Sequence, residues 1–118
     1  LVDGVIARWF SPGYADREPQ RFAAARATLL ATDPHGYSGV CAALRDGDLR
    51  DVVGSITLPT LVIGGVADQA TPIDQARWLH EHIAGSRLIE LSAAHLSNLD
   101  NEAEFTGALD RFLSETTV

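Results

Sequence analysis

The chain has 118 residues, the usual size of one domain, and 46% of them are hydrophobic, which is enough to bury a core. Its 16 acidic residues outnumber its 9 basic residues, so the formal net charge is −7. Nucleic acids and anionic membranes attract clustered Lys and Arg, and the basic residues here are scattered, so we expect neither as a partner. No apolar stretch is long enough to span a bilayer.

Two features of the sequence bear on its cellular context. The single cysteine, Cys41, cannot form an internal disulfide, which favours a reducing compartment, the cytoplasm. The sequence contains no methionine and begins with Leu1. We therefore expect it to be a piece of a longer protein.

The first half of the chain is predicted to form three short helices within residues 1–47. The first ends at Ser11-Pro12-Gly13, the second begins with Asp16 as its N-cap, and the third begins at Asp33-Pro34. Apolar residues in each recur at spacings of three and four, which places them on one face. The residues expected to face inward are Val2, Val5, Ile6, Trp9 and Phe10, then Phe22, Ala25, Leu29 and Leu30, then Tyr37, Cys41 and Leu44.

The second half is predicted to alternate strand and helix. Residues 60–63 form a continuous β-branched run, which is typical of a strand covered on both faces. A helix is predicted from Thr71, as its N-cap, to Gly85, followed by a strand over residues 87–91 and a last helix from about Asn101. This order predicts two parallel, adjacent strands. The apolar residues that we expect the last helix to bury are Phe105, Leu109, Phe112 and Leu113.

Two strands alone do not make a stable sheet. Further strands must therefore come from elsewhere in a longer protein or from a second copy of this chain. We expect either pairing with an absent N-terminal half or homo-oligomerisation.

Asp68 and His95 each follow one of the predicted strands. Gly64 and Gly65 are expected to let the backbone turn sharply before Asp68, and small residues flank His95. The carboxyl ends of parallel strands meet at one edge of a sheet, so the two side chains can form a hydrogen bond there. A carboxylate that binds one imidazole nitrogen fixes the tautomer and makes the other nitrogen a base. Either residue alone would be an ordinary structural one; the pair predicts a catalytic site.

These segments resemble the end of an α/β-hydrolase, and more narrowly the 3-oxoadipate enol-lactonases. The resemblance rests on residues 59–65, Asp68, Thr71-Pro72 and residues 93–98, and, in the first half, on residues 8–12, Tyr37, residues 41–44 and residues 48–50. It implies an α/β fold in which residues 1–51 are a helical cap segment. Residues 52–118 would then be the C-terminal part of the α/β-hydrolase core, with two parallel strand-helix units.

The resemblance also implies a catalytic triad in the order serine, acid, histidine, with Asp68 as the acid and His95 as the histidine. The serine of this family lies in a Gly-x-Ser-x-Gly turn, which this sequence lacks; residues 36–40 come nearest but miss the final glycine. The oxyanion-hole donors are expected to be missing with it. We predict that Trp9 lines the substrate pocket, and that Arg8 faces a substrate carboxylate. Where the family commonly has Glu-Pro after His-Leu-Ser-Asn, this chain has Asp100-Asn101-Glu102, a departure expected to have little effect.

The implied reaction is hydrolysis of a carboxylic ester or lactone in aromatic compound catabolism, with no cofactor. His80 and His82 are two residues apart on a predicted helix and point to different sides, so no metal site is expected. Two alternatives remain open. One is another α/β-hydrolase branch: a dehalogenase, a carbon–carbon bond hydrolase or a haloperoxidase. The other is a non-catalytic, self-associating module that pairs through its free strand edges.

Overall fold

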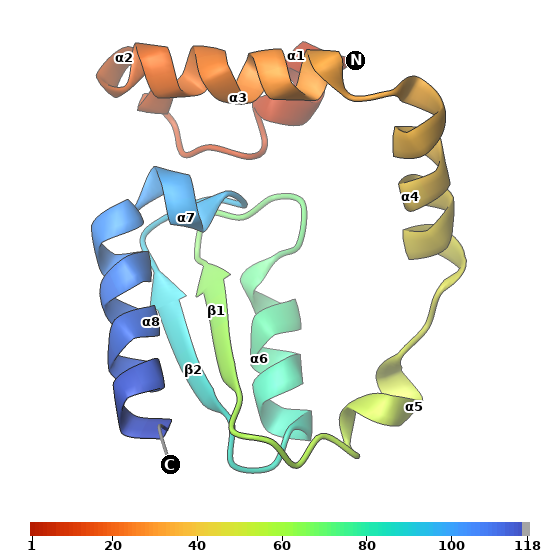
Figure 1. Ribbon diagram of the computed structural model, residues 1–118, viewed down its shortest axis with the longest axis vertical. Helices are drawn as coiled ribbons and strands as arrows, with labels where there is room; N and C mark the ends of the chain where they lie inside the picture. Colours follow the sequence, from red (N-terminus) through yellow and green to blue (C-terminus); the bar gives the residue numbers. More distant parts are fainter. Residues whose placement is uncertain (117–118) are drawn as a thin grey trace.

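The computed structural model describes residues 1–116 of the chain (Figure 1). Helices precede, separate and follow two strands. In chain order the elements are α1 (Val2–Ile6), α2 (Tyr14–Arg17), α3 (Pro19–Ala31), α4 (Pro34–Asp46), α5 (Arg50–Val53), β1 (Leu61–Gly65), α6 (Ile73–His82), β2 (Arg87–Leu91), α7 (Ser97–Asp100) and α8 (Glu102–Thr116).

The two strands form a parallel sheet, as the sequence predicts. Their register runs from Leu61 opposite Arg87 to Gly65 opposite Leu91, so both strands end at the same edge. Helices α6 and α8 both pack against the strands and lie on opposite sides of the strand pair (Figure 1). The continuous apolar run in β1 is explained by this two-sided cover.

Gly64 and Gly65 do not turn the chain, contrary to the prediction. Both belong to β1 and neither has a positive φ. A Cβ on Gly64 would lie 2.6 Å from Ile73 Cδ1, and a Cβ on Gly65 would lie 2.4 Å from the carbonyl oxygens of both Ala93 and Ala94. The glycines are needed because α6 and the loop after β2 approach the strand this closely.

The first helices differ from the prediction in their limits. Helix α1 ends at Ile6, so Trp9 and Phe10 lie in the turn that follows it. The helix predicted from Asp16 is two helices, because Pro19 disfavours a helical backbone at the residue before it; Glu18 has φ −131° and ψ 58°. Asp33 caps α4 as predicted, since its side chain accepts hydrogen bonds from the N–H groups of residues 35 and 36.

The best-packed apolar cluster joins the first helices to the loop after β2. Ile6, Phe10 and Tyr14 are buried together, with the Phe10 and Tyr14 rings stacked at a centroid distance of 4.4 Å. Leu96 and Leu99, which come after β2, pack against this cluster. Helices α1–α3 therefore form a layer (residues 2–31, the α1–α3 layer) over the carboxyl ends of the strands (Figure 1).

Several residues expected to be buried are not. In α4, Cys41 is exposed and Leu44 is 77% exposed. In α8, Leu109 is 38% exposed and Leu113 is 53% exposed. The spacing of apolar residues identifies one side of a helix but not what covers it. Helix α4 stands apart from the strands, on the side where α6 lies, and most of its residues are left exposed by the rest of residues 1–116 (Figure 1). The division of the chain at residue 51 remains a prediction.

The close contact at Gly65 gives a first testable prediction. Gly65→Ala should lower the free energy of unfolding by about 1–3 kcal/mol, because the added methyl group must displace the backbone of residues 93 and 94. Gly39→Ala in helix α4 is the matched control: its Cβ meets nothing within 4 Å, so it should raise stability by up to about 1 kcal/mol. Urea unfolding measures both. Equal stability of the two variants would contradict the packing described here.

Candidate functional site

Asp68 lies just past β1, in the loop that leads to α6. Its side chain is only 8% exposed. One carboxylate oxygen, Oδ1, accepts the N–H groups of Ala70 at 2.8 Å and Thr71 at 2.9 Å, and Oδ2 accepts the Thr71 hydroxyl at 2.8 Å. The loop thus orients the carboxylate with its own backbone before any distant residue contributes.

His95 lies in the loop between β2 and α7, and its Nδ1 is 2.9 Å from Asp68 Oδ2. The Thr71 hydroxyl oxygen lies 3.3 Å from the same nitrogen. A carboxylate only accepts hydrogen bonds, so Nδ1 carries the proton and donates it, which leaves Nε2 of the neutral ring as a base. No hydrogen bond from residues 1–116 engages Nε2, and the side chain is 32% exposed.

The surroundings of Asp68 favour its ionised form. Burial raises the pKa of the Asp68 carboxyl, but the Thr71 N–H, the His95 ring, the Thr71 hydroxyl and the Ala70 N–H together lower that pKa by more. The net pKa lies below the ordinary value of 3.8. Near neutral pH the carboxylate is therefore charged and can stabilise an imidazolium at His95.

The structure brings Trp9 to this pair but not Arg8. The Trp9 carbonyl accepts the N–H of Leu96 at 2.9 Å, and the Trp9 and His95 ring centroids are 6.3 Å apart. The side chain of Arg8 is exposed and makes no hydrogen bond or ion pair with another residue of the described chain. Trp9 is thus positioned to touch a molecule that reaches His95.

Two further residues, Thr71 and Asp100, contribute to the site in ways that differ from the prediction. Thr71 was expected to cap α6, but the N-cap is Pro72, without a side-chain bond, and the Thr71 hydroxyl binds Asp68 instead. Asp100, expected to have little effect, accepts hydrogen bonds from Ser11 and from the backbone of Ala94. The spacing of three from Asp68 to Thr71 is a usable local signal for the first contact. The contact between Asp100 and Ser11 has no local sequence signal, because the two residues are 89 positions apart.

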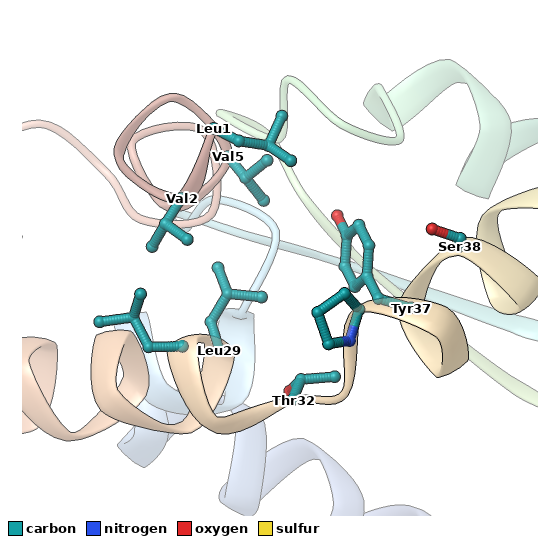
Figure 2. A pocket seen from close by; sticks show the side chains of 9 residues that line it. Leu1, Val2, Val5, Leu29, Thr32, Tyr37 and Ser38 are labelled. Atoms are coloured by element: carbon teal, nitrogen blue, oxygen red, sulfur yellow. The ribbon is translucent and has the colours of Figure 1, made fainter.

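An apolar cavity of about 210 Å³ lies elsewhere, between α1, the end of α3 and the start of α4 (Figure 2). The side chains that surround it are Leu1, Val2, Val5, Leu29, Leu30, Thr32, Pro34, Tyr37 and Ser38. Its only polar side-chain groups are three hydroxyls, so it offers no base. Ser38, from the nearest approach to a Gly-x-Ser-x-Gly motif, lies within helix α4 and not in a strand-to-helix turn.

The two histidines of α6, His80 and His82, each form a hydrogen bond with a different partner. His80 Nδ1 lies 2.8 Å from the Ser86 hydroxyl, and His82 Nδ1 lies 2.8 Å from the Trp78 carbonyl. Among residues 1–116, no group of three or more His, Cys, Asp or Glu side chains could hold a metal ion. Nor is any helix in that part of the chain long and apolar enough to cross a membrane.

The lowered pKa of Asp68 predicts a pH-dependent stability difference between the native chain and Asp68→Asn. A carboxyl with a lowered pKa in the folded state stabilises the protein above its unfolded pKa, and this contribution is lost as the pH falls through the folded value. The native chain should be more stable than the variant by about 1–3 kcal/mol at pH 5, and the difference should shrink towards about pH 2. Urea unfolding across this range measures it.

Asp110→Asn is the control, since Asp110 is exposed on α8. The difference in unfolding free energy between this variant and the native chain should not shrink in the way expected for Asp68→Asn. A constant difference for Asp68→Asn down to about pH 2 would show that the carboxylate is not held as described.

Known proteins resemble this chain in sequence and in fold. No protein-family model matches the sequence. The 3-oxoadipate enol-lactonase 2 of Acinetobacter baylyi is 34% identical over 93% of this chain and 41% of its own length. The crystal structure of the enol-lactonase from Burkholderia xenovorans LB400 superposes with a TM-score of 0.94 and 40% identity, over 96% of this chain and 44% of that one.

An esterase from Exiguobacterium antarcticum also superposes, with a TM-score of 0.85 and 32% identity, over 96% of this chain and 41% of that protein. The chain thus spans less than half the length of the relatives it matches. Over that span the order of helices and parallel strands is shared. The chain belongs to the α/β-hydrolase superfamily, has the fold of the C-terminal part of such a protein, and is similar throughout to 3-oxoadipate enol-lactonases.

Proposed function

We propose that this chain supplies the acid and the histidine of a serine-type α/β-hydrolase that cleaves a carboxylic ester or lactone. The observation that supports it is the 2.9 Å hydrogen bond between Asp68 and His95, at the carboxyl ends of two parallel strands. The similarity to enol-lactonases favours an enol-lactone substrate, as in the catabolism of aromatic compounds. The unpaired Cys41 favours a cytoplasmic location.

The mechanism follows from the protonation states of the two residues. His95 Nε2 takes the proton of a serine hydroxyl as the serine oxygen attacks the substrate carbonyl, and Asp68 stabilises the imidazolium that forms. The imidazolium then returns the proton to the departing enol oxygen, which leaves an acyl-enzyme. His95 next takes a proton from water as the water oxygen attacks the acyl carbon, and gives that proton to the serine oxygen as the bond between the acyl carbon and the serine breaks. This releases the carboxylic acid and restores the serine hydroxyl. No cofactor takes part.

The serine must come from a segment outside this sequence, and we propose that this segment docks along β1. Within residues 1–116, one edge of β1 is paired, with β2, and the other edge is free. A hollow of about 280 Å³ is lined by β1, α6, Asp68 and His95, where a further strand and its loop would bring a side chain to Nε2. Large apolar side chains are exposed in the segments that precede and follow β1 in the chain: Leu44, Leu49, Val52, Leu58 and Val66.

Trp9 and Arg8 are the proposed substrate-binding residues. The Trp9 ring, 6.3 Å from the His95 ring, offers an apolar wall beside the reacting carbonyl. Arg8 is adjacent in sequence and exposed, so its guanidinium is free to bind the carboxylate of an acidic lactone in a protein whose net charge is −7.

The proposal predicts activity only after reconstitution. The chain alone should not hydrolyse p-nitrophenyl acetate. Mixed with the separately expressed remainder of the Burkholderia enol-lactonase, it should do so, because the serine then reaches His95. Replacement of His95 by Ala should reduce the turnover of the mixture by at least about a thousandfold. A spectrophotometric assay of released nitrophenolate measures all three.

His80→Ala is the matched control. His80 lies near the C-terminal end of α6, where it binds Ser86, so the mixture with this variant should keep full activity. Turnover by the chain alone that depends on His95 would overturn the proposal. No turnover by the mixture, together with a stable dimer of the chain, would favour a self-associating module instead, which the free edge of β1 also permits.

Arg8 is tested by a difference between substrates. In the reconstituted enzyme, Arg8→Ala should raise KM for a lactone that bears a carboxylate by about fivefold, the value of an exposed ion pair of about 1 kcal/mol, and should leave kcat nearly unchanged. KM for neutral p-nitrophenyl acetate should not change. Arg111→Ala, which removes an exposed guanidinium from α8, is the control. An equal rise in KM for both substrates would contradict the proposed contact between Arg8 and the substrate carboxylate.

A further inference from the structure

We propose that Asp100 is a positioning residue: its carboxylate fixes the backbone beside His95 and makes the orientation of His95 depend on the seating of the α1–α3 layer. The inference rests on the proposed role of His95 as a base. It begins from three hydrogen bonds that converge on one carboxylate. Asp100 Oδ2 accepts the N–H of Ala94 at 2.7 Å and that of Ser11 at 3.1 Å, and Oδ1 accepts the Ser11 hydroxyl at 2.7 Å.

The backbone is held on both sides of His95. The N–H of the preceding residue, Ala94, binds Asp100, and the N–H of the following residue, Leu96, binds the carbonyl of Trp9 at 2.9 Å. Asp68 holds the His95 ring itself through Nδ1. The ring and both flanking amides are thus fixed by three separate acceptors, and one of these, the Trp9 carbonyl, belongs to the segment that follows α1.

The segment on the other side of Asp100 is rigid as well. Arg17 donates to the Pro12 carbonyl at 3.1 Å and to the Ser11 hydroxyl oxygen at 3.3 Å, so Ser11 is held between a cation and a carboxylate. The Tyr14 hydroxyl lies 3.4 Å from the Leu99 carbonyl, next to Asp100. The turn between α1 and α2 cannot shift without breaking the contacts of Asp100.

Burial makes the Asp100 contacts important. Ala94 is only 2% exposed, so water cannot readily replace the carboxylate as the acceptor of its N–H. Hydrogen bonds to a charged acceptor are stronger than those between neutral groups, and a buried N–H left without an acceptor is costly. A small displacement of a catalytic base is enough to impair it. Movement of the α1–α3 layer should therefore displace His95 through Asp100, Ala94 and Leu96.

The test is nuclear magnetic resonance of the 118-residue chain with Asp100→Ala and Asp100→Asn. In Asp100→Ala, amide hydrogen exchange at Ala94 and at Leu96 should accelerate by about tenfold to a hundredfold, and the His95 Nδ1 proton resonance should shift or broaden. The change at Leu96 is the decisive one, because its N–H bonds to Trp9 and not to Asp100.

Asp100→Asn should restore near-native values, because an amide oxygen can accept both N–H groups while the amide N–H donates to the Ser11 hydroxyl. Asp110→Ala is the matched control, since it removes an exposed carboxylate from α8 and should change none of these signals. Amides of the sheet, at Ile63 and Ile89, report whether the chain remains folded.

If Asp100→Ala unfolds the sheet, Ser11→Ala provides the test. It removes the contacts of the Ser11 hydroxyl with Asp100 and Arg17 but keeps the Asp100 carboxylate and its bonds to backbone N–H groups. It should accelerate Leu96 exchange by a few fold and shift the His95 resonance with the sheet intact. The inference is wrong if a folded Asp100→Ala chain keeps the native exchange rate at Leu96 and the native His95 resonance. If Asp100→Ala is unfolded, the same result in Ser11→Ala overturns the inference. None of these signals depends on ester turnover, so failure of the proposed function is distinguished from failure here.

Discussion

The parallel, in-register pairing of β1 and β2 positions every part of the candidate site. It brings both strands to an end at the same edge, at Gly65 and Leu91, so that the two loops begin side by side. The pairing continues into those loops, where the Ala67 N–H binds the Ala93 carbonyl at 3.0 Å. A carboxylate on the first loop and an imidazole on the second then meet with little freedom left, which is the pre-organisation that a catalytic base requires.

Two carboxylates complete the site in different ways. Asp68 binds the ring of His95 and selects its tautomer, whereas Asp100 binds the backbone beside it. Both rely on N–H donors for most of their contacts, and both would be poorly solvated if those donors moved away. Because Asp100 also holds Ser11, and the Phe10 ring packs in the same cluster as Leu96 and Leu99, the polar and apolar contacts bind the α1–α3 layer to the same loop.

Most of the large apolar side chains that are exposed lie on α4, on α5 and in the segments directly before and after β1. Leu30 of α3 and Leu109 and Leu113 of α8 are exposed as well. Soluble proteins rarely leave such a surface open without a partner for it. The relatives extend well beyond the matched span, since the chain covers 44% of the Burkholderia enol-lactonase, so the remainder of an α/β-hydrolase has the size to cover this surface.

Local signals in the sequence predict several features of this protein. The apolar run of β1, the cap formed by Asp33 and the positions of Asp68 and His95 directly after predicted strands all follow from residues a few positions apart. Other features arise only from packing between distant segments. Gly65 is required because a distant backbone lies against it, Leu44 is exposed because nothing in the described chain covers α4, and Asp100 binds Ser11 across 89 positions. A single sequence contains no signal for such contacts, because they arise only when elements far apart in the chain pack together.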